Sequence, residues 1–260
     1  MSLVDVSAFA DELATASGRV ILPFFRTALV AENKALPGSF DPVTEADRAA
    51  ERVMRQLIAE RYPEHGIVGE EFGAERSEAE LCWVLDPIDG TRAFMSGLPL
   101  WGTLIGLLRS GRAAYGMMHQ PFIGERFFGD GTRAGYRGPH GSGELRTRPC
   151  ASLAEATLST TSPAMFSEAE LATFLRVEKQ ARLTRYGYDC YAYCMLAAGH
   201  LDLVIEAGLK PYDIVALTPI IEGAGGVVTT WTGDRPERGG AIVAAGDPRL
   251  HATVLEMLAR

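Results

Sequence analysis

Four separate stretches of the chain place carboxylates beside breaks in the backbone pattern. They carry Asp47, Glu70-Glu71, Asp86 with Asp89, and Asp213. Mg²⁺ prefers oxygen ligands and is usually held by a few carboxylates together with water and substrate phosphate. Two such ions a few ångströms apart can activate a water molecule and stabilise the leaving oxygen of an in-line displacement. The set of acids therefore indicates metal-assisted hydrolysis of a phosphate ester.

The stretch around the paired carboxylates is the most informative. The apolar run 81–85 is typical of a buried strand, and it ends at Asp86. We expect Pro87, which has no N–H, to end the ladder so that the chain turns directly after Asp86. Gly90 permits a conformation that a side chain would forbid, and Thr91 can then open a helix. Carboxylates beside the N–H groups of a helix start suit a divalent ion and a phosphate together, although turns also use Asp, Pro and Gly freely.

Each of the other acids has a structural alternative. Glu70-Glu71 could be an exposed pair in the loop after a short strand at 66–69. Asp47 stands three residues after Thr44 and could complete a capping box. Asp213 could complement the dipole of a helical first turn. Considered singly, the structural interpretation of Asp47 and of Asp213 is favoured, so the functional interpretation depends on the whole set.

The pattern of apolar residues predicts a layered α/β protein. Helices are expected at 4–29 and from Thr44 to about 61, with a break at Pro37-Gly38 between them, and an antiparallel meander over 101–137. The Gly-, Arg- and Pro-rich segment 138–150 is the expected boundary between two packed halves, 1–145 with most of the acids and 146–260 completing the site. The second half should alternate strands near 157–160, 182–186, 201–206, 226–231 and 240–245 with helices near 167–178, 189–198, 212–224 and 247–259.

Composition excludes several classes of protein. The net charge of −8 and the lack of a Lys/Arg-rich run argue against nonspecific nucleic-acid binding. No apolar run approaches membrane-spanning length, and no secretion signal begins the sequence. The four cysteines lack metal-finger spacing and are interpreted as reduced, buried thiols. We therefore expect a cytoplasmic protein that acts on a small phosphorylated metabolite, with neither nucleic acid nor membrane as partner.

Together the motifs resemble those of the inositol monophosphatase family of Mg²⁺-dependent, lithium-sensitive phosphatases. The resemblance implies an α–β–α–β–α sandwich that is usually dimeric, so a homodimer is expected. The motifs are Asp41-Pro42-Val43-Thr44-Glu45-Ala46-Asp47, Gly69-Glu70-Glu71, Asp86-Pro87-Ile88-Asp89-Gly90-Thr91, and Tyr212-Asp213 with Glu222-Gly223-Ala224-Gly225-Gly226.

The resemblance also implies two or three Mg²⁺ ions in each active site. The first ion would be held by Glu70, Asp86 and the carbonyl of Ile88. The second would be held by Asp86, Asp89 and Asp213, and Glu71 would lie near a weaker third ion.

The same resemblance assigns the catalytic and phosphate-binding roles. Thr91 and Asp47 would orient and deprotonate the attacking water, because a hydroxyl bonded to a buried carboxylate can relay a proton. The phosphate would be bound at Asp89, Gly90 and Thr91, chiefly through the backbone N–H groups of the last two. No covalent phospho-enzyme is required.

Within the family, the strings 96–104, 187–193 and 203–213 are more similar to those of the histidinol-phosphate phosphatases. Histidinol phosphate carries an ammonium and a titratable imidazole, which Asp189 and Glu206 would complement through charge-assisted hydrogen bonds. Gly187 and Tyr188 belong to the same substrate-binding string. Asp189 could instead be a helix N-cap, and Glu206 could be a surface acid or could contact a sugar hydroxyl.

These observations predict a Mg²⁺-dependent phosphomonoesterase that hydrolyses L-histidinol phosphate in histidine biosynthesis. An inositol-1-phosphate or broad sugar-phosphate phosphatase is the alternative with the same chemistry. A non-catalytic binding relative is a third possibility, and the complete set of acids argues against it.

Overall fold

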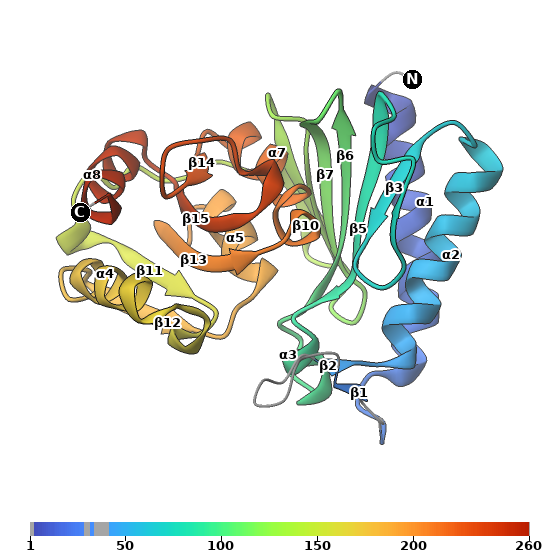
Figure 1. Ribbon diagram of the computed structural model, residues 1–260, viewed down its shortest axis with the longest axis horizontal. Helices are drawn as coiled ribbons and strands as arrows, with labels where there is room; N and C mark the ends of the chain where they lie inside the picture. Colours follow the sequence, from blue (N-terminus) through green and yellow to red (C-terminus); the bar gives the residue numbers. More distant parts are fainter. Residues whose placement is uncertain (1–2, 29–31, 34–41, 260) are drawn as a thin grey trace.

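The computed structural model describes residues 3–28, 32–33 and 42–259. The predicted break at Pro37-Gly38 and the motif residue Asp41 lie outside these ranges. Within them the chain forms alternating layers of helix and sheet. Figure 1 shows these layers side by side, from the helices α1 and α2 at one end to α4 and α8 at the other.

The larger sheet has eight strands in the order β10-β9-β8-β7-β6-β5-β3-β4. Its neighbouring strands are antiparallel except β3 and β5, which are parallel. The run from β6 to β9 confirms the predicted meander. The strands are β3 (Gly66–Gly69), β4 (Gly73–Glu75), β5 (Leu81–Asp89), β6 (Gly102–Arg109), β7 (Arg112–Gln120), β8 (Glu125–Gly129), β9 (Ala134–Gly138) and β10 (Gly141–Glu144).

Two helices cover the outer face of this sheet, α1 (Leu3–Ile21) and α2 (Glu45–Arg61). Their apolar faces pack with Trp83, Ile105 and Met117 of the central strands in one buried cluster. The predicted first helix ends earlier than expected, because a 3₁₀ turn, η1 (Leu22–Phe24), with Pro in its first positions follows Ile21. A two-stranded sheet, β1 (Glu32–Asn33) with β2 (Pro42–Val43), was not predicted.

The smaller sheet has five strands in the order β12-β11-β13-β15-β14. Alternate residues of β13 and β15 face opposite sides: Val204 and Ile242 pack on the helices between the sheets, and Leu203 and Val243 pack on the outer helices. This alternation follows from the two-residue period of a strand. The strands are β11 (Thr157–Thr160), β12 (Leu183–Tyr186), β13 (Leu203–Leu209), β14 (Val227–Thr230) and β15 (Gly240–Ala245).

The remaining helices complete an α–β–α–β–α sandwich, which confirms the predicted fold class. Those between the sheets are α5 (Cys190–Ala197), α6 (Pro211–Ile214) and α7 (Leu217–Gly223), and those outside are α4 (Glu168–Glu178) and α8 (Pro248–Leu258). The single helix expected at 212–224 is instead two helices. Pro219 cannot donate a hydrogen bond to residue 215, whereas it fits the first turn of a new helix.

The turn expected after Asp86 is wrong. β5 continues through Pro87 to Asp89, and its pairing with β6 shifts register between Asp86 and Asp89. A bulge tolerates proline because one residue of the bulged strand is left out of the ladder. Thr103 of β6 donates its hydroxyl to the carbonyl of Pro87 at 2.8 Å and so secures the bulge. Both carboxylates therefore stand on one irregular strand end.

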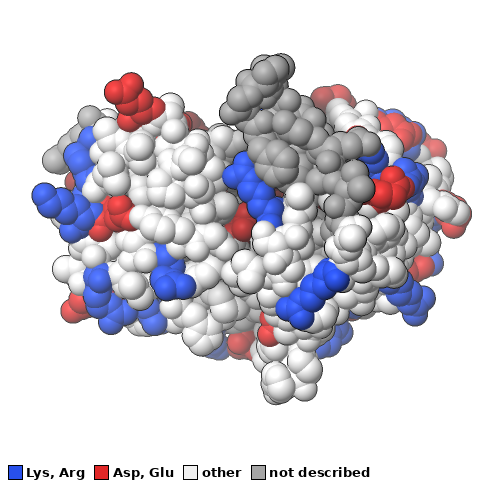
Figure 2. Space-filling view, turned by 90° about the horizontal axis from the view of Figure 1, so that it is seen from below, with Lys and Arg blue, Asp and Glu red and all other residues white. Residues whose placement is uncertain are grey.

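No helix in the described ranges combines the length and the apolar composition needed to cross a membrane. On the face shown in Figure 2, Lys and Arg side chains are interspersed with Asp and Glu side chains. A polyanion meeting the described part of this face would therefore encounter charges of both signs.

His119 of β7 provides a test of the packing between α1 and the sheet. Its ring is buried, its Nδ1 accepts a hydrogen bond from Arg126 Nε at 3.3 Å, and burial and the Arg126 charge lower its pKa to about 4. An unfolded histidine titrates near 6.5, so between pH 6.5 and 4 the unfolded chain binds a proton that the folded chain does not. The free energy of unfolding should fall as pH drops through this window, by about 2 kcal/mol at pH 5.

Urea unfolding of the wild type and of His119→Asn at pH 7 and pH 5 measures this contribution. Between pH 7 and pH 5, the free energy of unfolding of the variant should fall by about 2 kcal/mol less than that of the wild type. All other titrating groups are shared by the two proteins and cancel in the difference. Equal losses would show that His119 is protonated without penalty in the fold.

Candidate active site

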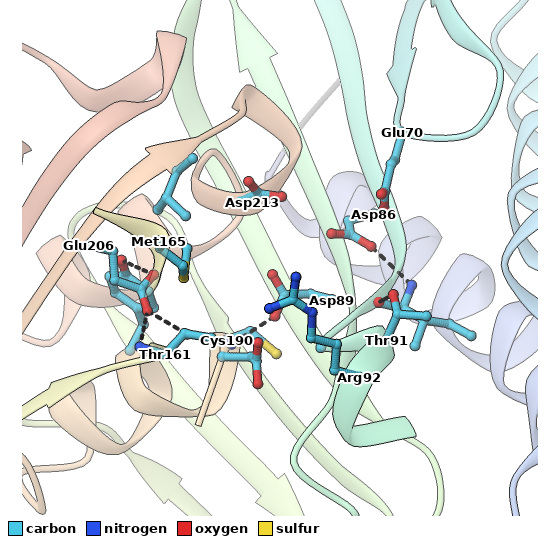
Figure 3. A pocket seen from close by; sticks show the side chains of 15 residues that line it. Glu70, Asp86, Asp89, Thr91, Arg92, Thr161, Met165, Cys190, Glu206 and Asp213 are labelled. Carbon is cyan, nitrogen blue, oxygen red and sulfur yellow. Dashed lines mark hydrogen bonds between the residues drawn. The ribbon is translucent and has the colours of Figure 1, made fainter. Parts of the chain in front are cut away.

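A cavity of about 210 Å³ opens between the two sheets, where β5, α3 (Thr91–Met95), α5, α6 and β13 converge (Figure 3). Of the described residues that line it, one is basic, Arg92, and six are acidic: Glu70, Asp86, Asp89, Asp189, Glu206 and Asp213. The fold thus brings acids from distant stretches of the chain to one place.

The bulge at the end of β5 fixes the first pair of carboxylates. Asp86 Oδ1 accepts the N–H of Ile88 at 3.0 Å, and Asp89 Oδ1 accepts the N–H of Cys190 at 2.8 Å. Gly90 has φ 87°, and a Cβ there would lie 2.8 Å from the Leu100 carbonyl oxygen. Glycine is therefore required where the chain leaves the strand and enters α3.

Asp213 reaches the same place from the short helix α6. Its Oδ2 accepts the N–H of Lys210 at 2.7 Å, so the predicted role at the helix start is also present. Asp86, Asp89 and Asp213 each offer an oxygen, and these oxygens lie within 4.8 Å of one another. Three carboxylate oxygens at this spacing could hold a metal ion, and an all-oxygen set suits a hard divalent cation.

The crowding of carboxylates raises the pKa values of Asp86, Asp89 and Asp213, because their charged forms are buried and repel one another. Burial raises the pKa of Asp86 well above its usual range, and the charges of Glu70, Asp89 and Asp213 raise it further. Burial, then the charges of Asp189 and Asp213, do the same to the pKa of Asp89. Burial raises the pKa of Asp213 to about 7, with Glu70 adding to the rise and the Lys210 N–H opposing it. A divalent cation among these groups would favour their charged forms.

Glu70 and Glu71 follow β3 but are placed differently. Glu70 lines the cavity, its backbone N–H donates to the Leu85 carbonyl at 3.2 Å, and its charge raises the pKa of Asp86. Glu71 does not line the cavity, and its backbone N–H is bound by Glu51 at 2.7 Å. Both glutamates are half-buried, so the alternative of an exposed pair is wrong, and Glu70 faces the site.

Asp47, the predicted general base, is buried and does not line the cavity. It forms the capping box foreseen as its alternative, because its Oδ2 accepts the N–H of Thr44 at 2.9 Å and also the Thr44 hydroxyl. Its Oδ1 is buried with no hydrogen-bond partner among the described residues. Burial raises the pKa of Asp47 to about 6, and the charge of Glu70 contributes to the rise. The Thr91 hydroxyl donates to the Ile88 carbonyl at 3.0 Å in this structure.

The two acids expected to bind substrate both face the cavity. Asp189 has φ 45°, rare for a residue with a side chain, and makes no side-chain hydrogen bond that caps α5, so the capping alternative is wrong. Glu206 is 3% exposed, so the surface alternative is also wrong. Thr161 donates its N–H and its hydroxyl to Glu206 at 2.9 and 2.6 Å, and the Tyr193 hydroxyl donates at 3.0 Å.

Burial also shifts the pKa values of these two acids. It raises the pKa of Asp189 to about 7, reinforced by the charge of Glu206 and opposed by Arg92. Burial raises the pKa of Glu206, which its hydrogen bonds from Thr161 and Tyr193 counteract. A cationic group between Asp189 and Glu206 would stabilise both carboxylates.

Other residues considered from the sequence are placed elsewhere. Gly187 and Tyr188 do not line the cavity: Gly187 closes the end of β12 onto Thr160 and Thr161 through its N–H, and the Tyr188 hydroxyl accepts from Arg185 at 2.9 Å. Three basic residues of the second half also do not line it: Arg182, Arg185 and Lys210.

Sequence reasoning missed several residues of the lining. Arg92 follows directly after the acid-rich string and projects toward the cavity (Figure 3). Thr161 follows β11, a parallel strand, at the end where ligand sites collect. Tyr193 stands in the string 187–193, of which only Gly187, Tyr188 and Asp189 were expected to bind substrate. The position of Thr161 after a predicted strand was the one usable signal.

Comparison with known proteins agrees with this geometry. The model of the inositol monophosphatase family matches residues 2–260. The chain is 44% identical to the bifunctional phosphatase IMPL2, chloroplastic, of Arabidopsis thaliana, over 97% of this chain and 74% of that protein. It is 35% identical to a histidinol-phosphatase of Mycobacterium tuberculosis over 84% of each chain. An inositol monophosphatase structure from Zymomonas mobilis superposes with a TM-score of 0.89 at 40% identity, covering 100% of both chains.

The chain belongs to the inositol monophosphatase family. It is a phosphoric monoester hydrolase, a class whose members act on small phosphorylated substrates. The predicted family and enzyme class are thereby confirmed, and the cluster of acids is a site that could bind metal.

Proposed function

We propose that the protein is a Mg²⁺-dependent phosphatase that hydrolyses L-histidinol phosphate to L-histidinol and phosphate. The observation that carries the metal-dependent part is the convergence of Asp86, Asp89 and Asp213, with oxygens within 4.8 Å of one another, in a cavity whose charged lining residues are all acidic except Arg92. The observation that favours this substrate is a second pair of buried acids, Asp189 and Glu206, on the same cavity.

The group Asp86, Asp89 and Asp213 could hold a metal ion, which supports a proposal of two or three Mg²⁺ ions in the site. In this proposal Glu70, Asp86 and the Ile88 carbonyl hold the first ion, and Asp86, Asp89 and Asp213 hold the second, with Glu71 near a weaker third. The Ile88 carbonyl accepts from Thr91, and its second lone pair remains for a metal. When bound, the ions would lower the pKa of the attacking water and offset the charge of the phosphate.

The chain's own groups move the proton. The unpartnered Oδ1 of Asp47 is a buried acceptor, and its raised pKa, about 6, gives it the basicity of a general base near neutral pH. We assign Thr91 the relay: its hydroxyl would turn from the Ile88 carbonyl toward Asp47, pass its own proton to the Asp47 carboxylate and take up a proton from the attacking water. The backbone N–H groups of Gly90 and Thr91, at the entry to α3 and beside Asp89, bind the phosphate oxygens.

The remaining charges of the cavity support a cationic substrate. Apart from the proposed metal ligands, the charged residues that line the described cavity are Asp189, Glu206 and Arg92. The two acids are therefore matched by one positive charge. The ammonium and imidazole of histidinol phosphate would supply positive charge beside these acids, whereas a neutral polyol would not. The strained backbone at Asp189 supports a functional role, because such a conformation costs on the order of 1–3 kcal/mol.

A phosphate-release assay with histidinol phosphate, inositol 1-phosphate and fructose 1,6-bisphosphate tests the substrate. Histidinol phosphate should be turned over with the highest kcat/KM, and only when Mg²⁺ is present. Comparable turnover of inositol phosphate would instead support the inositol or broad-specificity alternative, which the similarity to the Zymomonas mobilis enzyme favours. Absence of any Mg²⁺-dependent release would favour a non-catalytic relative.

Asp189→Asn tests the charge recognition directly. Loss of one charge-assisted hydrogen bond, roughly 1.5–3 kcal/mol, should raise KM for histidinol phosphate about ten- to a hundredfold. Asparagine tolerates a positive φ, so the local backbone should be kept. Steady-state kinetics with p-nitrophenyl phosphate, which has no cationic group, should change little. An equal rise of KM for both substrates would show that Asp189 only shapes the chain.

The remaining parts of the proposal concern context. We propose a homodimer, inhibition by lithium, a cytoplasmic location and a place in histidine biosynthesis, each of which stays a prediction. We also propose residues 1–145 and 146–260 as the two structural halves. The eight-stranded sheet draws its strands from residues 66–144 and the five-stranded sheet from residues 157–245, which supports this division.

A further inference from the structure

Glu51 is a buried carboxylate of α2 that does not line the cavity. Its exposure is 0%, and it stands one helical turn after Asp47, on the same face of the helix. Its Oε2 accepts the N–H of Glu71 at 2.7 Å, and its Oε1 accepts the N–H of Phe72 at 3.2 Å. The carboxylate therefore binds the backbone of the loop that immediately follows Glu70.

This contact completes a clamp around Glu70. On one side, the Glu70 N–H donates to the Leu85 carbonyl of β5, the residue before Asp86. On the other side, the next two N–H groups are bound by Glu51. The backbone of Glu70 is thus fixed to the strand that carries Asp86 and to the helix that carries Asp47.

Arg55 holds the clamp in place. Its Nε donates to Glu51 Oε1 at 2.7 Å, and its guanidinium also donates to the Gly73 carbonyl at the far end of the same loop. The arginine compensates the buried charge of Glu51, because a buried carboxylate is tolerated when it is paired and hydrogen-bonded.

Gly69 explains how the carboxylate comes so close. A Cβ at Gly69 would lie 2.0 Å from Glu51 Oε1, so only glycine allows the carboxylate to lie against the end of β3. The glycine before the two glutamates is therefore required by Glu51.

We propose that Glu51 is a positioning residue for the metal site: together with Arg55 it holds the loop 70–73 so that Glu70 meets Asp86 at the distance a shared divalent ion needs. The inference rests on the proposed metal-binding role of Glu70, and it does not depend on which phosphate ester is hydrolysed. Groups that orient metal ligands typically contribute roughly 10- to 100-fold to metal affinity.

Mn²⁺, which prefers oxygen ligands as Mg²⁺ does, is a suitable probe. We would titrate the 260-residue protein with MnCl₂ in the absence of substrate and follow the EPR signal of the free ion. Glu51→Gln keeps the shape of the side chain but places an amide NH₂ against backbone N–H donors and Arg55. Its Mn²⁺ dissociation constant should rise at least about tenfold. Glu60→Gln, the same change at an exposed position of α2, should leave the constant unchanged.

A double variant separates positioning from general stability. If Glu51 acts through Glu70, Glu51→Gln should weaken Mn²⁺ binding little further in a Glu70→Gln background. An unchanged Mn²⁺ affinity in folded Glu51→Gln, or full additivity with Glu70→Gln, would overturn the proposal. Should Glu51→Gln fail to fold, Arg55→Gln must weaken Mn²⁺ binding in the same direction, and unchanged binding there overturns the proposal equally. Failure of histidinol-phosphate turnover leaves all these titrations interpretable, so the two proposals fail separately.

Discussion

Replacing Asp213 by asparagine is expected to lower kcat/KM roughly a thousandfold or more at ordinary Mg²⁺ concentration. Loss of a ligand to a catalytic divalent ion removes several kcal/mol of transition-state stabilisation, and each 1.36 kcal/mol is about one factor of ten. The variant should stay folded, because asparagine can still accept the Lys210 N–H and because one of several crowded acids is removed. Phosphate release and thermal unfolding measured on the same preparation check both statements.

Glu256→Gln on α8 is the matched control, since it removes one negative charge from an exposed position of the second half. Its activity should equal that of the wild type. Undiminished activity of Asp213→Asn would remove Asp213 from the metal site. An inactive but unfolded Asp213→Asn would show instead that its main contribution is the capping of α6.

Asp47→Asn should reduce kcat by roughly 10²–10⁴-fold, the usual contribution of general acid–base catalysis. The melting temperature should be unchanged or higher. The amide oxygen can take over the hydrogen bonds from Thr44, and the neutral amide NH₂ replaces the buried carboxylate oxygen that has no partner, so the variant no longer buries a charge beside Glu70. Kinetics at saturating Mg²⁺ and differential scanning calorimetry measure the two effects.

Thr91→Val tests whether the two residues act as one unit. It should lose activity in a similar range, and the double variant should be little worse than the more impaired single variant. Independent, multiplicative losses would show that Thr91 and Asp47 do not share one proton. Full activity of Asp47→Asn would assign the base elsewhere.

Most of the local structure around Asp86 could be predicted from the sequence, because it depends on residues close to one another in the chain. An apolar run buries a strand, Gly90 allows the left-handed exit, and Thr91 begins α3. The error at Pro87 arose because a bulge depends on the partner strand. The register of β6 and the Thr103 hydroxyl decide whether the proline ends the strand or sits in its irregularity.

The alternatives at Asp189 and Glu206 were left open because they depend on tertiary structure. The hydrogen bonds from Thr161 and Tyr193 to Glu206 join residues 45 and 13 positions apart in the sequence. The positive φ of Asp189 is a conformation that its residue type does not predict. Arg92 is adjacent to the acidic string, but nothing in the sequence tells which way a lone arginine points.

The role of Glu51 also depends on tertiary structure and could not be predicted from the sequence. On α2 it is one more charged residue in a helix rich in charges. Besides Arg55, its partners are backbone N–H groups 20 and 21 residues away. Backbone groups have no sequence signature. The spacing from Asp47 and the glycine at position 69 gain meaning only once the helix is docked against β3.

The central claim is that acids from three distant segments, at Glu70, at Asp86 with Asp89, and at Asp213, form one site for divalent ions. Anomalous scattering from a crystal soaked in MnCl₂ tests it most directly. We predict one strong peak between Asp86, Asp89 and Asp213 and a second between Glu70 and Asp86. The first of these peaks should be absent in Asp213→Asn. A map with no peak among these carboxylates at saturating Mn²⁺, or with peaks only elsewhere on the protein, would contradict the proposed site and the mechanism built on it.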